Sequence, residues 1–256
     1  MKGSGAGMKR TGKRGIFLWV SVVYGLSFMC YVPMLLERRG TAVPGGVLWI
    51  RYLFVCVPAI AAVWRAACEH DVKRYFARMF SGKITRRQVL AWALVVAVGI
   101  LISGVYSLIM GIHVFRDTYS SITALLTGCG YLFATALVEE AAWRGFLLER
   151  ISWRKNGAYG IVLTGIIWAV WHMPMWMIRN SLDLEQAAYL CIWTVLVSIV
   201  LGAAYCQCRN VLFAAALHAS FNICYAAPIQ YNIAGLAAVM AMGAVLGKNR
   251  WREFGK

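Results

Sequence analysis

The chain has 256 residues, of which 61% are hydrophobic and only 14% are charged. Soluble domains average roughly 25% charged and about 45–50% apolar residues, so this chain cannot cover a water-facing surface with polar groups. The balance of 26 Lys and Arg against 10 Asp and Glu gives a net charge of +16. These values exclude a large soluble domain and a disulfide-stapled secreted fold, and they indicate an all-α polytopic membrane protein.

The apolar residues gather in eight runs, each close to the roughly 20 residues that a helix needs to cross a bilayer. The runs are residues 15–36, 47–68, 89–112, 121–143, 158–178, 187–206, 211–226 and 232–247. We therefore expect about eight transmembrane helices in a single domain over residues 15–247. The Gly-rich, basic residues 1–14 are expected to form a disordered tail, and residues 248–256 a basic cytoplasmic tail.

The basic residues are distributed unevenly between the two sides of the membrane. With eight spans and an internal N-terminus, twenty of them lie on cytoplasmic segments and four on external loops. This asymmetry predicts a multi-pass protein with both termini in the cytoplasm, and we expect a bacterial cell membrane. The basic residues do not alternate with aromatic ones on a polar surface, so we expect the lipid bilayer and no nucleic acid as a partner. The longest loop, residues 69–88, is either a solvated loop that fixes topology or a basic amphipathic helix on the inner leaflet.

Two adjacent glutamates lie inside the fourth apolar run, where ionisable groups are costly and therefore indicate function. Adjacent helical residues point about 100° apart, so Glu139 and Glu140 cannot share one partner. Glu140 and Arg144 are four residues apart and can form an ion pair on one helix face. Glu139 then faces another partner, or it simply reaches toward water while the ion pair fixes the helix end.

Two histidines lie inside the fifth and seventh runs. Trp168 and His172 are four residues apart, as are His218 and Asn222, so each pair shares one helix face. We expect the fourth, fifth and seventh helices to bring these polar groups together in one buried site, because scattering them in lipid would leave each unsatisfied. For the three helices to bring their polar groups to one level in the membrane, the fourth helix must continue to about Arg150.

Three elements thus follow one another along the chain: Glu139-Glu140-x-x-x-Arg144, Trp168-x-x-x-His172 and His218-x-x-x-Asn222. Their order and spacing resemble the CPBP family, the CAAX-protease and bacteriocin-processing (Abi) intramembrane endopeptidases. The resemblance extends over residues 131–222, and the family's eight spans also match the count above. The second element of the family usually begins with Phe, so Trp168 bears on the shape of the substrate pocket.

Peptide hydrolysis needs an activated water, a stabilised oxyanion and a proton for the leaving amine. A desolvated Glu139 suits a general base that later acts as an acid, and His172 could hold the same water or protonate the amine. His218 and Asn222 offer two donors on one face, as an oxyanion hole requires. The resemblance implies the same assignments, with Glu140 and Arg144 organising the site.

Zinc is an open alternative, because Glu139, His172 and His218 could ligate it and leave a position for water. The sequence has no HExxH pair, and the two histidines come from separate helices, which favours a mechanism without a cofactor.

We expect an intramembrane endopeptidase whose substrate is a hydrophobic peptide or protein C-terminus. This substrate is either a bacteriocin or signalling-peptide precursor, which we favour, or a CAAX-like C-terminus. The alternative is a non-catalytic self-immunity or scaffold protein that uses the same fold. A transporter would show internal repeats, and the sequence has none.

Overall fold

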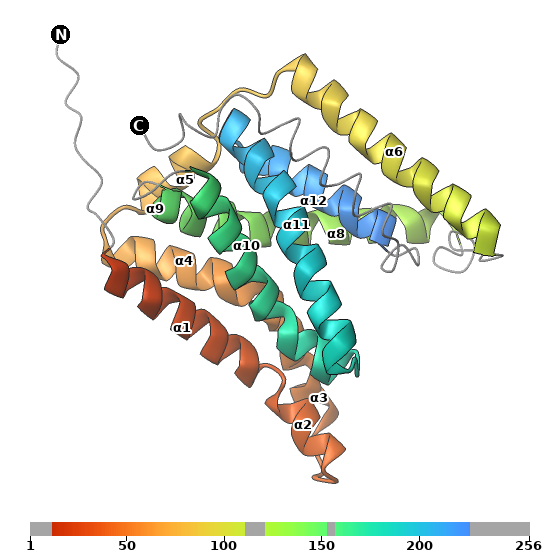
Figure 1. The fold of residues 1–256 in the computed structure, drawn as a ribbon. Coiled ribbons are helices and arrows are strands. Elements are labelled where there is room, and N and C mark those ends of the chain that lie inside the picture. The colour runs from red at the N-terminus through yellow and green to blue at the C-terminus, as the bar shows by residue number, and fades with distance from the viewer. Residues whose placement is uncertain (1–11, 111–120, 153–156, 226–256) are drawn as a thin grey trace.

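The computed structural model describes residues 12–110, 121–152 and 157–225, which are helical apart from turns and one isolated bridge between Phe80 and Asn210 (Figure 1). The α-helices are α1 (Lys13–Met29), α2 (Val32–Arg38), α3 (Gly45–Leu48), α4 (Val57–Cys68), α5 (Val72–Met79), α6 (Arg86–Met110), α8 (Ile122–Ala142), α9 (Glu149–Ser152), α10 (Gly157–Pro174), α11 (Leu184–Cys208) and α12 (Val211–Tyr225). A 3₁₀ segment, η1 (Trp49–Cys56), precedes α4, and two π-helical segments, η2 (Trp143–Leu148) and η3 (Met175–Arg179), follow α8 and α10.

Five helical stretches among the described residues are long and apolar enough to cross a membrane. They are Lys13–Arg38, Gly45–Cys68, Ile122–Ile151, Gly157–Arg179 and Leu184–Cys208. These correspond to five of the eight predicted runs, α6 occupies most of the third run, and the shorter α12 occupies the seventh. The all-α, polytopic membrane architecture is therefore confirmed. The eighth run, residues 232–247, and the tail 248–256 lie outside the described residues, as does most of the tail 1–14.

The fourth predicted helix continues past its apolar run, as the depth of the site required. The helical stretch runs without interruption from Ile122 to Ile151 and passes through the π-helical turn η2. A π-turn adds a residue to one turn of a helix and is frequent at functional sites. Every residue of η2 is buried, so this turn lies inside the helix bundle.

Small residues allow α10 and α11 to pack closely along each other. A Cβ atom on Gly165 would lie 2.9 Å from Cβ of Ser198, and one on Gly202 would lie 2.8 Å from Cγ2 of Ile161. Small residues at helix interfaces let two backbones approach closely inside a membrane. This contact fixes the position of α11 and therefore determines which of its side chains reach α8.

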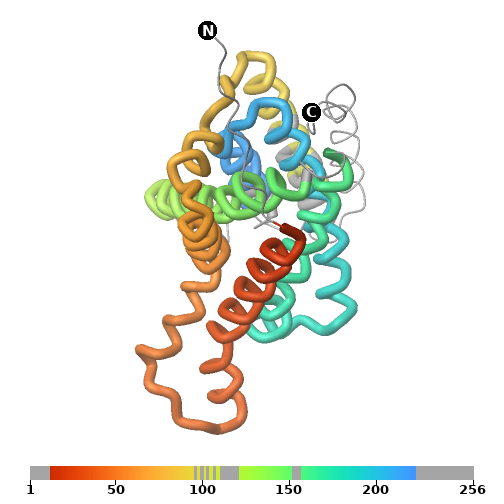
Figure 2. The backbone as a smooth tube through the Cα atoms, turned by 90° about the vertical axis from the view of Figure 1, so that its left-hand side faces the viewer, coloured from red at the N-terminus to blue at the C-terminus, as the bar shows by residue number. Residues whose placement is uncertain are grey.

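Helix α1 packs against the other side of α10, and Figure 2 shows the two helices lying alongside each other. Tyr24 donates a hydrogen bond to the carbonyl of Ile167 (2.7 Å), and Trp171 donates one to Ser27 Oγ (2.7 Å). Because both bonds are largely shielded from solvent and join helices distant in sequence, they fix the rotation of α10, which carries Trp168 and His172.

Candidate active site

The structure brings together side chains from α8, η2, α10 and α12. Glu139 and Glu140 come from the end of α8, Arg144 from η2, Trp168 and His172 from α10, and His218 from α12. Most of these side chains are buried, and His172 is largely buried. The fourth, fifth and seventh predicted helices therefore converge in space as the sequence predicted.

Glu140 is the centre of a buried charged cluster. Its Oε1 atom lies 2.6 Å from Arg144 Nη1 and 2.9 Å from His218 Nδ1. Glu140 and Arg144 both have side chains that are 0% exposed, so the pair is shielded from screening by solvent. Arg144 also donates a hydrogen bond through Nη2 to Ser198 Oγ on α11, at 2.9 Å. The cluster thereby joins α8, η2, α11 and α12.

Glu139 faces a different set of partners. Its Oε2 atom accepts a hydrogen bond from the indole Nε1 of Trp168 at 2.9 Å. The same oxygen lies 3.9 Å from His172 Nε2, beyond hydrogen-bonding distance. The two glutamates therefore take separate partners, as the 100° rotation between adjacent helical residues requires.

The hydrogen bonding of His172 fixes which ring nitrogen carries the proton. Its Nδ1 lies 3.0 Å from the backbone carbonyl of Trp168, and a carbonyl can only accept. In the neutral imidazole Nδ1 is therefore protonated, and Nε2 presents a lone pair toward Glu139. Trp176 stacks on the ring with a centroid distance of 5.1 Å and an interplanar angle of 10°, which holds its plane.

Trp168 lies between the two halves of the site. Besides its bond to Glu139, its ring contacts His172 and His218 edge-on, at centroid distances of 5.3 and 5.1 Å. The Arg144 guanidinium carbon lies 4.7 Å from the centroid of the same ring, within cation–π range. The sequence assigned Trp168 to the substrate pocket, whereas the structure gives it a direct hydrogen bond to a site carboxylate. The four-residue spacing indicated the contact with His172 but could not show this bond.

Asn222 is the predicted site residue that the structure does not join to the cluster. It lies one turn beyond His218 on α12 and is half-buried. Among the described residues, no hydrogen bond links its amide to the glutamates or the histidines. His218, its predicted partner in an oxyanion hole, directs Nδ1 to Glu140.

Two residues at the α10–α11 contact were missed by the sequence analysis. Ser198 holds Arg144, and Gly165 makes room for Ser198. A signal was present, because Ser198 and Gly202 are four residues apart in an apolar run and form the small-xxx-small pattern of a helix contact. The pattern indicates a helix contact without identifying the arginine that the serine binds.

The donor arrangement does not fit the zinc site considered from sequence. Among the described residues, no three His, Cys, Asp or Glu side chains lie together in a way that could hold a metal ion. The roles proposed below for these side chains therefore involve no metal.

The segment of the chain that matches known proteins is the one that holds the candidate site. Residues 120–224 match the family model described as "Type II CAAX prenyl endopeptidase Rce1-like". This segment holds α8 to α11, all but the last residue of α12, and every predicted site residue. Over 71 residues the chain is 30% identical to CAAX prenyl protease 2 of Methanococcus maripaludis, an alignment that covers 28% of this chain and 26% of that protein. The match thus spans about a quarter of the length of that relative. Over residues 120–224, which are less than half of the chain, the sequence is thus similar to type II CAAX prenyl endopeptidases, and this similarity supports the resemblance to the CPBP family.

Proposed function

We propose that this protein is an intramembrane endopeptidase that cleaves a peptide bond near the C-terminus of a prenylated protein or peptide. The observation that carries the proposal is the pair of acceptor atoms, Glu139 Oε2 and His172 Nε2, held 3.9 Å apart in a buried site. One water molecule at hydrogen-bonding distance, about 2.8 Å, from each atom could donate a proton to both. The family description favours a CAAX-like C-terminus over the bacteriocin precursor that the sequence analysis favoured.

In this mechanism Glu139 acts as the general base. The water oxygen attacks the scissile carbonyl carbon while one of its protons passes to the Glu139 carboxylate, giving a tetrahedral intermediate with a negatively charged oxygen. The carbon–nitrogen bond then breaks, and the proton held by Glu139 passes to the leaving amine. His172 accepts the second hydrogen bond of the water and so orients its lone pair toward the substrate.

His218 and Asn222 are proposed to stabilise the oxyanion. Since Glu140 is a carboxylate, His218 donates through Nδ1, and donation to the oxyanion requires a proton on Nε2 as well. Glu140 lies close enough to balance the charge of that imidazolium, at 2.9 Å. The Asn222 amide, one turn further along α12, would supply a second donor when substrate fills the site.

The test uses the full chain in lipid nanodiscs with a farnesylated peptide that ends in a CAAX sequence, and mass spectrometry identifies the products. We expect release of a C-terminal tripeptide, lost in Glu139→Gln and His172→Ala. Glu37→Gln and His70→Asn are matched controls, because both residues are exposed and distant in sequence from the three elements. Turnover by Glu139→Gln at the parent rate would overturn the mechanism. A parent protein that cleaves no prenylated or unprenylated peptide would favour the non-catalytic alternative.

A further inference from the structure

The segment that connects α4 to α6 lies at one surface of the membrane. Helix α4 ends at Cys68 and α6 begins at Arg86, and residues 89–110 of α6 are uncharged over a length of about 33 Å at 1.5 Å per residue. The residues between these helices therefore lie where the lipid headgroups meet water. They include the short helix α5, so this loop is helical over Val72–Met79.

Helix α5 has two contrasting faces. Tyr75 and Met79, each 2% exposed, pack into the protein. Phe76 is 45% exposed, Phe80, which directly follows the helix, is 47% exposed, and Lys73 is exposed as well. Amphipathic helices at membrane interfaces carry this combination of aromatic and basic residues on their outer side.

The outer surface carries an uncompensated positive charge. Residues 69–88 hold six basic residues and only two acids, Glu69 and Asp71. Glu69 pairs with Arg65 and Arg150, and Asp71 pairs with Arg74 and Arg78. Within the described ranges, four exposed basic residues make no ion pair with an acid: Lys73, Lys83, Arg86 and Arg87.

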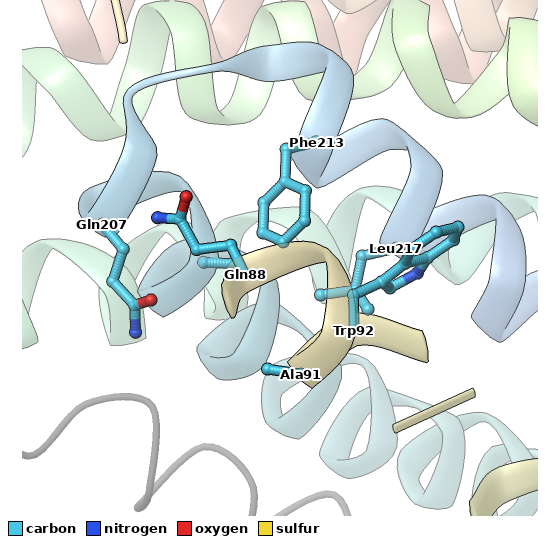
Figure 3. A pocket seen from close by; sticks show the side chains of 7 residues that line it. Gln88, Ala91, Trp92, Gln207, Phe213 and Leu217 are labelled. Carbon is cyan, nitrogen blue, oxygen red and sulfur yellow. The ribbon is translucent and has the colours of Figure 1, made fainter. Parts of the chain in front are cut away.

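An apolar pocket opens beside these charges, where the start of α6 meets α11 and α12. Trp92, Phe213 and Leu217 line this shallow recess together with Gln88 and Gln207 (Figure 3). Gln88 and Trp92 face the pocket one helical turn apart and directly follow Arg86 and Arg87 in sequence. Basic side chains next to an apolar recess suit a phospholipid, whose phosphate is anionic and whose acyl chain is apolar.

The inner face of α5 is attached to the helix that carries Glu139 and Glu140. Tyr75 donates a hydrogen bond to the carbonyl of Ala141, the residue after Glu140, at 3.0 Å. Burial raises the pKa of the Tyr75 phenol, which keeps it protonated as the donor. Met79 packs on η2 so closely that a Cβ atom on Gly145 would lie 2.8 Å from its Sδ atom.

The end of the segment is attached to the other site helix. Gly82 donates a backbone hydrogen bond to the Arg209 carbonyl at 3.2 Å, and Asn210 Nδ2 donates one to the Gly82 carbonyl at 3.1 Å. A Cβ atom on Gly82 would collide with the carbonyl oxygen of Cys208, so only glycine fits there. Residues 208–210 lead directly into α12, which carries His218.

We propose that the outer surface of residues 73–92 binds an anionic phospholipid of the adjacent leaflet, and that this lipid activates the protease by holding α5 against η2. The anionic headgroups lie along the surface that carries the four unpaired basic residues, and an acyl chain lies against the apolar recess beside Trp92. Activation rests on the proposed function, whereas lipid binding does not.

Binding is measured without any reaction. The full chain with Phe76→Trp is reconstituted into phosphatidylcholine vesicles. One set of vesicles contains brominated phosphatidylglycerol, and a second set contains brominated phosphatidylcholine. The fluorescence quenching of the added tryptophan is the difference between this variant and the parent chain. We expect the brominated phosphatidylglycerol to quench at much lower mole fraction. Lys73→Gln/Lys83→Gln should raise the required mole fraction roughly 25-fold, because each basic residue near an anionic surface is worth about fivefold in affinity. Arg38→Gln/Arg39→Gln removes two charges at the end of α2 and should leave the required mole fraction of brominated phosphatidylglycerol unchanged.

Activation is measured with a prenylated peptide of zero net charge, so that vesicle charge does not concentrate the substrate. We expect phosphatidylglycerol to raise kcat/KM about fivefold or more, within the usual range of coupling between two sites. Tyr75→Phe should lose this increase and keep the quenching. Equal quenching by both brominated lipids, or equal effects of the two double variants, would overturn the lipid site. Normal activation of Tyr75→Phe would overturn the coupling, and an inactive parent chain with selective quenching would refute only the proteolytic function.

Discussion

Arg144→Ala tests whether the buried charged cluster supports the fold as well as the site. Arg144 is 0% exposed and bonds to Glu140 and Ser198, so its removal leaves the Glu140 carboxylate with only His218 as a partner among the described residues. Breaking one half of a buried ion pair costs about 3–5 kcal/mol, and chains of this size lose about 2–4 °C in Tm per kcal/mol. We therefore expect Tm to fall by roughly 6–20 °C.

The assay is thermal unfolding of the purified chain in one detergent, followed by intrinsic fluorescence. Arg39→Ala is the matched control, because Arg39 is exposed and its truncation should change the free energy of unfolding by at most about 0.5 kcal/mol. Glu140→Gln/Arg144→Ala should be less destabilised than the sum of the two single variants, since removing both charges leaves no unpaired ion. An Arg144→Ala protein with the Tm of Arg39→Ala would refute the cluster as a source of stability.

Three further variants and one topology test follow from the structure. Trp168→Phe keeps an aromatic ring but removes the hydrogen-bond donor to Glu139. We expect kcat to fall about 10- to 100-fold with KM little changed, because a hydrogen bond to a charged group contributes a free energy of that size. An unchanged kcat would refute this bond. Gly165→Ala should lower stability by about 1–3 kcal/mol in the same unfolding assay, whereas Gly25→Ala, where a Cβ atom meets nothing within 4 Å, should not. Asn222→Ala should lower kcat roughly 10²–10³-fold if its amide binds the oxyanion, and a normal kcat would remove it from the mechanism. Tags at either end of the chain should be cleaved by added protease only from the cytoplasmic side, and external cleavage of one of them would exclude an even number of spans.

The sequence was sufficient to predict the elements and the convergence of the site. Long apolar runs have few structural solutions in a bilayer, so their helical state and approximate bounds follow from composition alone. Spacing of four residues places two side chains on one helix face, which correctly paired Glu140 with Arg144 and placed Trp168 against His172. The requirement that buried polar groups be satisfied then predicts that the three helices come together, as they do in the structure.

Contacts between helices distant in sequence could not be predicted in this way. The bond of Trp168 to Glu139 depends on how α10 is rotated against α8, and that rotation is set by α1 through Tyr24 and Ser27. No periodicity within one helix reports the rotation of another. The attachment of α5 to Ala141 has the same origin, because it depends on the close approach that Gly145 permits.

The most direct test of shared water activation is a double-mutant cycle on kcat with Glu139→Gln, His172→Ala and the combined variant. If both side chains hold one water, as their 3.9 Å separation indicates, either change alone removes the activated water. The combined variant should then have nearly the same kcat as the more impaired single variant, because residues that act as a unit are not additive. Losses that multiply in the combined variant would show that the two residues act in separate steps and would contradict the mechanism.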